Sequence, residues 1–368
     1  MEGYEGGADD VTVAHQNSSA VIGLLDTNGR PVVGTLAQRE QQLDSMLASG
    51  ATRAWGAGNR ARGEEPDEYR TCFERDRDRI LHSSAFRRLA GKTQVFIFPD
   101  DHMRTRLTHA LEVAQVATGI ARAVGLNVAL TEAIALGHDC GHGPGGHASE
   151  EAFDPYVPDG FDHATWGANV SLASLNLCRE TLDGIANHSW SRPAPSTPEG
   201  EVVSWADRVA YVCHDFEDAV AARIVTIEEV PTLVRERSGE RRGQQLGSFI
   251  NAMIRTITTS GVIGMDAAHA EALAAFRSFN YETIYLRDPS RQQAEAVVRM
   301  LRGLVEFFAL HPTLIPDVVE RGSESESADR SLHDAVRYVA GMTDRFACQS
   351  AVTLLDWPVD QLPNGIDR

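Results

Sequence analysis

Apolar residues recur at helical spacing through most of this chain, and that periodicity limits which folds it can adopt. In 105–124 they return at intervals of three and four, and Gly125 follows as a stop signal. Only 93–98 (TQVFIF) alternates as a strand would. The sequence therefore predicts an all-α fold with at most a short β-hairpin near 93–98. Helices are expected at 39–48, 73–90, 105–124, 128–139, 201–224, 244–260, 266–279, 290–311 and 329–347.

Three parts of the chain differ in composition. Residues 1–68 are rich in Gly, Asp and Ser, and we expect a partly irregular N-terminal extension there. Residues 69–225 carry most of the histidine and aspartate motifs and are expected to form the core, with an exposed connection at the proline-rich stretch 189–200. Residues 226–368 should form a helical region packed on that core. With 368 residues and 42% hydrophobic content, the chain can bury a large interior.

Composition also narrows the kind of site and partner. The five cysteines are scattered and never in CxxC spacing, so a metal ion would be held by histidine and carboxylate. The net charge of -18 disfavours nucleic acid as a partner, and an anionic substrate would need local cations. No apolar run is long enough to cross a bilayer and no signal-peptide pattern opens the sequence, so we expect a cytoplasmic protein without a membrane partner.

An unusual polar stripe marks the predicted helix 201–224. Asp207, Tyr211 and Asp215 are spaced by four residues on a helix that is otherwise largely apolar. This spacing places them on one face. Burying such a stripe is costly unless it meets a cation or a polar ligand. The stripe therefore predicts a binding site.

Imidazoles and carboxylates elsewhere could complete that site. His109 lies at the edge of the buried face of 105–124, and His138 with Asp139 ends the next predicted helix. Two neutral imidazoles and two carboxylates, with Asp207 as the fourth ligand, suit one divalent ion: Mn²⁺, Mg²⁺, Fe²⁺, Ni²⁺ or Zn²⁺. Such an ion would activate water for attack on phosphorus and screen phosphate charge.

Four sequence blocks carry a resemblance to a known family. They are RTCFERDRDRILHSSAFRRLAGKTQVF (70–96), RTRLTHALEVAQVA (104–117), EAIALGHDCGHGPGGHASEEA (132–152) and WADRVAYVCHDFEDA (205–219). The chain resembles the HD-domain superfamily, with its H…HD…D signature, and within it the deoxyguanosinetriphosphate triphosphohydrolase-like branch. That resemblance implies an HD-domain catalytic core at 69–225 and hydrolysis of deoxynucleoside triphosphates (dNTPs) to deoxynucleoside and tripolyphosphate. It also implies a homo-oligomer, with an activating nucleotide as a further possible partner.

The resemblance assigns roles at the reaction centre. It gives the metal ligands as His109, His138, Asp139 and Asp207. The catalytic residues it implies are His147, which would protonate the leaving 5′ oxygen, Glu150, which would orient His147, and His142, which would touch the α-phosphate.

It also implies a set of substrate-binding residues. Arg106 matches a phosphate-binding arginine, and Tyr211 with Asp215 matches the pair that holds the deoxyribose. Gln94 matches a position near the sugar or base, and His163 a position in the phosphate pocket. Lys92 belongs to a group of cations, near Arg106 in sequence, that would meet the charge of an anionic substrate.

Two alternatives stay open. His163 and His188 lie in the order expected of a second metal site, which would suit a two-metal phosphomonoesterase or phosphodiesterase acting on another nucleotide. A catalytically silent nucleotide-binding protein is the other alternative. The segment 138–147 (HDCGHGPGGH) has Gly143 and Gly145 where the family usually has proline and an aromatic residue, so substrate choice is not simply inherited.

Overall fold

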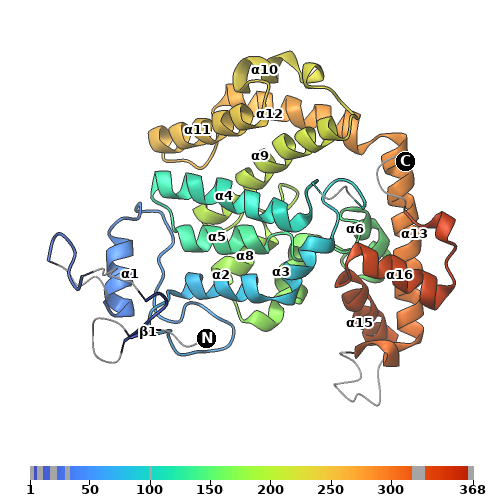
Figure 1. Ribbon diagram of the computed structural model, residues 1–368, viewed down its shortest axis with the longest axis horizontal. Coiled ribbons are helices and arrows are strands. Elements are labelled where there is room, and N and C mark those ends of the chain that lie inside the picture. Colours follow the sequence, from blue (N-terminus) through green and yellow to red (C-terminus); the bar gives the residue numbers. More distant parts are fainter. Residues whose placement is uncertain are drawn as a thin grey trace.

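The computed structural model describes residues 4–5, 11–16, 23–29, 34–98, 102–316 and 328–363. Within these ranges the regular secondary structure is almost entirely helical (Figure 1), which confirms the all-α prediction. The strands there are β1 (Tyr4–Glu5) and β2 (Thr12–Val13), a two-residue antiparallel pair in the N-terminal extension.

A central bundle forms around one buried apolar cluster, with α4 packed against α5 and α9 and α5 packed against α2 and α8. Figure 1 shows these helices in the middle of the molecule. Asn127 caps α5 through its side chain, and Gly125 ends α4 in the left-handed conformation. The bundle consists of α2 (Cys72–His82), α4 (Arg106–Val124), α5 (Val128–Gly137), α8 (Arg179–Ala186) and α9 (Pro198–Ala221).

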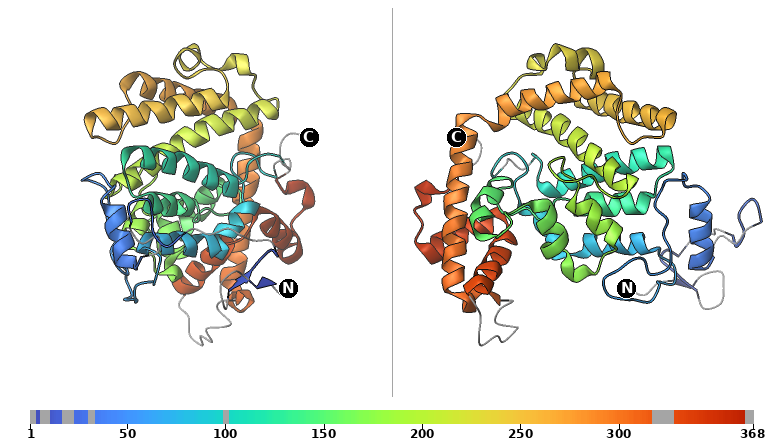
Figure 2. Two further views of the ribbon diagram at one scale, coloured as in Figure 1. Left: turned by 60° about the vertical axis from the view of Figure 1, so that its left-hand side comes forward. Right: turned by 180° about the vertical axis from the view of Figure 1, so that it is seen from behind.

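Two further helical layers flank this bundle. One lies over α9 and contains α10 (Thr232–Ser238), α11 (Arg242–Ser260) and α12 (Ala267–Asn280). The other packs on α6 and contains α13 (Asp288–Leu310), α15 (Ala328–Ala340) and α16 (Asp344–Leu355), as both views in Figure 2 show. The other α-helices of the described residues are α1 (Leu36–Asp44), α3 (Ser84–Arg88), α6 (Ala148–Phe153) and α7 (His163–Trp166).

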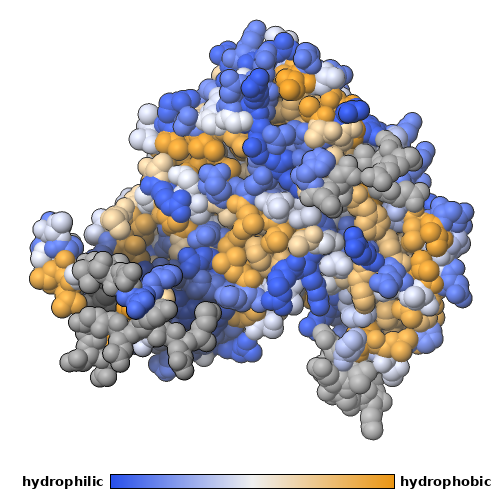
Figure 3. All heavy atoms as spheres, viewed as in Figure 1, coloured by the Kyte–Doolittle hydropathy of each residue, from blue (hydrophilic) through white to orange (hydrophobic). Residues whose placement is uncertain are grey.

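The surface seen in Figure 3 is largely hydrophilic, and its apolar residues gather in separate areas. No helix among the described residues is both long and apolar enough to span a membrane.

Several predicted helix bounds were wrong, and capping residues explain the differences. The helix expected at 73–90 is broken at Ser83, whose extended backbone caps α3. The helix expected at 329–347 ends at Ala340, because Thr343 is the N-cap of a new helix. Thr35 forms a capping box with Gln38, so α1 begins before the predicted residue 39. The short helices α6, α7, α8 and α10 were not predicted.

The segment 93–98 does not form a hairpin. Thr93 makes an isolated bridge with Thr105, and the following residues bend rather than pair. Val95 and Phe96 pack beside the α9–α12 cluster, while Ile97 packs beside the α13–α16 cluster. The alternation of apolar residues therefore reflects contacts with two different clusters, not with two faces of a sheet.

Candidate metal centre and active-site cavity

Three helix segments bring the predicted metal ligands together. His109 lies in the first turns of α4, His138 and Asp139 directly follow α5, and Asp207 lies on α9. Helix α9 buries one apolar face against α4 and α5 and another against α12. The stripe that begins with Asp207 lies between these two faces, so it borders the site instead of the core.

The four side chains place their donor atoms close to one another. His109 Nε2 is 3.0 Å from Asp207 Oδ1, and His138 Nε2 is 3.5 Å from Asp139 Oδ1 and 3.7 Å from Asp207 Oδ1. Ligands about 2.1 Å from one ion lie roughly 3.0–3.4 Å apart at octahedral or tetrahedral angles. The observed separations are close to this range.

The chemistry of these donors fits a divalent ion. His138 Nδ1 donates to the backbone oxygen of Ala135 at 2.7 Å, and its buried Nε2 has no hydrogen-bond partner within the described ranges. A histidine ligand is commonly oriented in this way. Burial alone would raise the pKa of Asp139, but the charges of Arg106 and His138 outweigh it and hold the pKa well below its usual range. The carboxylate is thus ready to bind a cation.

The predicted catalytic residues form a second group beside the first. Glu150 Oε1 accepts from His147 Nδ1 at 3.0 Å and from His163 Nδ1 at 2.9 Å. Burial raises the pKa of Glu150, but these two hydrogen bonds outweigh that effect and lower it below the usual range. His142 stacks on His163, with ring centroids 3.7 Å apart, and its Nε2 is 3.3 Å from Asp139 Oδ1.

His188 extends this group toward the metal ligands. Its Nε2 is 3.3 Å from His163 Nε2, and its ring lies edge-on to His138 with centroids 4.9 Å apart. Its Nδ1 donates to the backbone oxygen of Ile185 at 2.8 Å. Burial, together with the neighbouring imidazoles, lowers the pKa of His188 to about 4. The residue is therefore neutral near pH 7, and its ring has one nitrogen free to accept.

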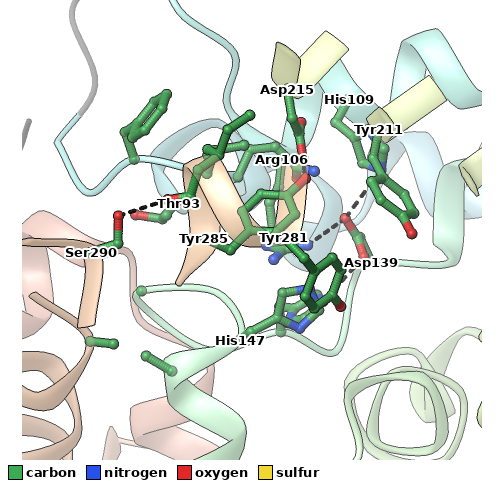
Figure 4. A pocket seen from close by; sticks show the side chains of 18 of the residues that line it. Thr93, Arg106, His109, Asp139, His147, Tyr211, Asp215, Tyr281, Tyr285 and Ser290 are labelled. Atoms are coloured by element: carbon green, nitrogen blue, oxygen red, sulfur yellow. Dashed lines mark hydrogen bonds and ion pairs between the residues drawn. The ribbon is translucent and has the colours of Figure 1, made fainter. Parts of the chain in front are cut away.

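Members of both groups line one cavity of about 430 Å³ (Figure 4). Arg106 also lines it and binds Asp139 through Nη1 at 2.7 Å, while its buried Nε and Nη2 have no hydrogen-bond partner in the described part of the chain. Tyr285 donates to Asp215, whose pKa burial raises to about 7. The other Asp215 oxygen is buried and has no partner among the described residues, and the same holds for Oε1 of Gln94. Tyr211 also lines this cavity.

Sequence reasoning missed several residues of the cavity wall. Arg208 directly follows Asp207, but its position off the polar stripe gave no signal. Arg277 donates to the Tyr211 hydroxyl at 3.0 Å and lies over the ring of Tyr281, which Figure 4 shows above His147. Other missed lining residues include Ser189 and Trp190 from the connection 189–200, Ser204 on α9, Tyr285, and, at the start of α13, Arg287, Ser290 and Gln293.

Lys92 does not lie where the sequence suggested. It is buried outside the cavity lining, and its ammonium donates to the backbone oxygens of His142 and of Ala340, the latter at 2.9 Å. Burial lowers its pKa to about 8. The Lys92 ammonium binds the backbone of segment 138–147 on the side away from the cavity. We therefore withdraw its assignment to substrate binding.

Comparison with known proteins identifies the family. The HD domain family model matches residues 106–212, and the phosphohydrolase-associated domain matches residues 263–352. A deoxyguanosinetriphosphate triphosphohydrolase-like protein of Caldanaerobacter subterraneus subsp. tengcongensis is 40% identical over 309 residues, which cover 82% of this chain and 90% of the relative. One from Clostridium perfringens strain 13 is 40% identical over 306 residues, covering 78% and 87%. The chain therefore belongs to the HD-domain phosphohydrolases, in the deoxyguanosinetriphosphate triphosphohydrolase-like family.

Proposed function

We propose that this protein hydrolyses dNTPs at the α-phosphorus, giving a deoxynucleoside and tripolyphosphate. The observation that carries the proposal is that three predicted metal ligands (His109, Asp139 and Asp207) and His147, which is hydrogen-bonded to Glu150, line the same cavity as a group of arginines. Its volume lies within the roughly 300–1,000 Å³ typical of small-molecule sites. The names of the relatives point to the same substrate class.

His109, His138, Asp139 and Asp207 would hold the divalent ion, which supplies activation of water and polarisation of the phosphate. We propose one ion at this site, and Mn²⁺, Mg²⁺, Fe²⁺, Ni²⁺ and Zn²⁺ all suit these ligands.

Charge in the cavity suits a polyphosphate. Arg106 keeps two guanidinium nitrogens without protein partners, and Arg208 keeps its Nε in the same state. Such buried donors are costly unless a ligand accepts from them. Arg106, Arg208 and Arg277 thus place three cations on the cavity wall, although the protein as a whole has a net charge of -18. We assign them to the phosphate chain.

Polar atoms near the Tyr211–Asp215 stripe suit a sugar. The unpartnered Asp215 oxygen can accept a hydrogen bond from a sugar hydroxyl group. The Tyr211 ring offers a flat surface in the same cavity. The Gln94 side-chain oxygen can accept from the sugar or base. We therefore place the deoxyribose against α9.

In the proposed reaction, a water oxygen forms a bond to the α-phosphorus, that water gives up one proton to solvent, and the bond from phosphorus to the 5′ oxygen breaks. The bonding electron pair passes to the 5′ oxygen, which takes a proton from His147. Glu150 orients that imidazole and stabilises its protonated form. The exposed position of His147 lets solvent restore its proton.

The experiment is product analysis with each of the four dNTPs, alone and as mixtures that include an activating nucleotide. With Mn²⁺ or Mg²⁺, we expect deoxynucleoside and tripolyphosphate in equal amounts. Asp207→Asn protein purified in parallel reports contaminating phosphatases. Absence of tripolyphosphate under all these conditions contradicts the proposal, and nucleotide binding without turnover would instead support a silent nucleotide-binding protein.

One observation favours a second candidate, a two-metal phosphomonoesterase or phosphodiesterase. The Nε2 atoms of His163 and His188 face each other at 3.3 Å, and donor atoms of Asp139 and His138 lie close to His188, so a second ion could bind beside the first. Metal analysis separates the candidates: two ions per chain, one of them lost in His188→Ala, would favour the two-metal enzyme.

A further inference from the structure

A buried carboxylate from the associated domain binds two loops of the active site. Asp344 opens α16 and is only 7% exposed. Its Oδ1 accepts from the backbone N–H of Gly145 at 2.8 Å. Its Oδ2 accepts from the backbone N–H and the hydroxyl of Thr93, at 2.9 and 2.5 Å. Both oxygens therefore accept hydrogen bonds, and all three donors lie outside the associated domain.

The two loops lead directly to residues with roles in the proposed reaction. Gly145 lies two residues before His147, in the segment 138–147. Thr93 pairs with Thr105, the N-cap of α4, and Arg106 follows at once. Asp344 therefore binds the two loops that lead to Arg106, the proposed phosphate-binding cation, and to His147, the proposed proton donor.

Close packing shows how little freedom these loops have. Gly146 adopts a positive φ of 63°, and a Cβ atom there would lie 2.9 Å from Arg106 Nη2 and 3.0 Å from the Thr93 oxygen. The loop thus lies directly against the guanidinium and against the Thr93 backbone. A shift of the Gly145 amide would therefore displace both the Arg106 guanidinium and the Thr93 backbone.

A second contact links the same region of the associated domain to the same segment. Lys92 donates to the backbone oxygens of His142 and of Ala340, the last residue of α15. The turn between α15 and α16 thus holds segment 138–147 at two points, through Ala340 by way of Lys92 and through Asp344 directly.

We propose that Asp344 is a positioning residue, which fixes the segment 138–147 and the Thr93 loop so that His147 and Arg106 share one substrate geometry. It touches neither substrate nor metal ligand. The activity arm of its test rests on the proposed function, and a second arm does not.

The test is Asp344→Asn in the full-length, metal-loaded protein. An amide keeps one acceptor and turns its NH₂ group toward a donor, so one loop loses its anchor. Because a small displacement of catalytic groups can cost about 100-fold, we expect kcat for dNTP hydrolysis to fall about 10- to 100-fold while KM stays within about threefold. Metal content should match the wild type, since all four ligands are untouched.

Hydrogen–deuterium exchange supplies the second arm. The amides of Thr93 and Gly145 should exchange faster in Asp344→Asn than in the wild type. This reading does not depend on which reaction the protein catalyses. If the wild type hydrolyses no dNTP, exchange alone decides: faster exchange supports the positioning role and unchanged exchange overturns it.

Thr343→Ala is the matched control. Thr343 caps the same helix by accepting from the Phe346 amide and makes no hydrogen bond to either loop. We expect it to lower stability while leaving kcat and loop exchange as in the wild type. An equal loss of kcat in both variants would overturn the proposal, because the effect would then follow from a weakened α16.

Lys92→Met covers the case in which Asp344→Asn does not fold. It removes the other link between the α15–α16 turn and segment 138–147. The positioning role predicts a lower kcat with little change in KM. A variant with wild-type kcat and unchanged exchange in segment 138–147 would contradict it.

Discussion

The guanidinium of Arg208 lies over the indole ring of Trp190, with its Cζ atom 3.4 Å from the ring centroid. Trp190 belongs to the proline-rich connection 189–200, and its N–H donates to the backbone oxygen of Ser204 at 3.1 Å. The ring is therefore held by α9, the helix that carries Arg208. The stack fixes the orientation of a cation that otherwise has a buried nitrogen without a partner.

Trp190→Ala should weaken substrate binding. A lost cation–π contact of about 1–2 kcal/mol corresponds to a rise in KM of roughly 5- to 30-fold, with kcat nearly unchanged. Steady-state kinetics would measure it. Trp190→Phe retains an aromatic face and serves as the control. In an Arg208→Ala background the tryptophan substitution should add little, and a full additional effect there would refute the coupling.

Glu150→Gln should reduce kcat by about 10²–10⁴-fold, because the neutral amide no longer stabilises a protonated His147. Substrate binding should persist, since Glu150 faces imidazoles and not the cations assigned to phosphate. Isothermal titration and single-turnover kinetics would separate the two effects. Glu151→Gln, which alters the exposed neighbour on the same helix, should behave as the wild type. Equal activity in both variants would remove Glu150 from the mechanism.

His109→Asn should lower the bound divalent metal far below the wild-type amount and abolish hydrolysis, because one of four ligands is lost. Elemental analysis of purified protein measures this directly. His214→Asn is the matched control, since His214 is also a buried imidazole but faces Glu112 at 3.0 Å. Unchanged metal content in His109→Asn would show that the ion lies elsewhere.

Asp215 gives a stability change with a defined sign. Burial raises its pKa to about 7 in the folded protein, although the hydrogen bond from Tyr285 opposes the shift. In the unfolded chain the pKa is about 3.9. Its contribution to stability is thus complete below about pH 4 and is lost as pH rises through 7.

Asp215→Asn removes this dependence. Relative to wild type, its free energy of unfolding should rise between pH 4 and pH 7 by at most about 1.4 kcal/mol per unit. Urea denaturation in EDTA keeps metal binding out of the comparison. Tyr285→Phe should move the transition to higher pH, because it removes the interaction that lowers the pKa. If the free energies of unfolding of wild type and Asp215→Asn change with pH in parallel, the raised pKa of the buried Asp215 carboxyl is contradicted.

Parts of the fold and site could be predicted because their signals are local. Helical periodicity defined the helices that carry His109 and Asp207, and the unusual cost of a polar stripe on α9 marked the cavity. The full ligand set followed from residue type and spacing together with the resemblance to the HD-domain signature. The helix breaks at Ser83 and Thr343 were not predicted because the helical spacing of apolar residues continues on both sides of these N-caps.

Other features depend on contacts that no local pattern contains. Lys92 lies in sequence among the cations expected to meet an anionic substrate, but Ala340, about 250 residues later, supplies a carbonyl that binds it. Trp190 lies in a proline-rich connection without periodicity, yet it packs beside the cavity. Asp344 falls inside the helix predicted at 329–347, and its hydrogen bonds form only because the fold brings the Thr93 and Gly145 amides to it.

Hydrolysis in H₂¹⁸O followed by ³¹P NMR tests the central claim most directly. Attack at the α-phosphorus with loss of the 5′ oxygen places the label in tripolyphosphate and leaves the deoxynucleoside unlabelled. We predict one ¹⁸O atom on a terminal phosphorus of tripolyphosphate. Label in orthophosphate or pyrophosphate, with a nucleoside mono- or diphosphate as the other product, would contradict the proposed reaction.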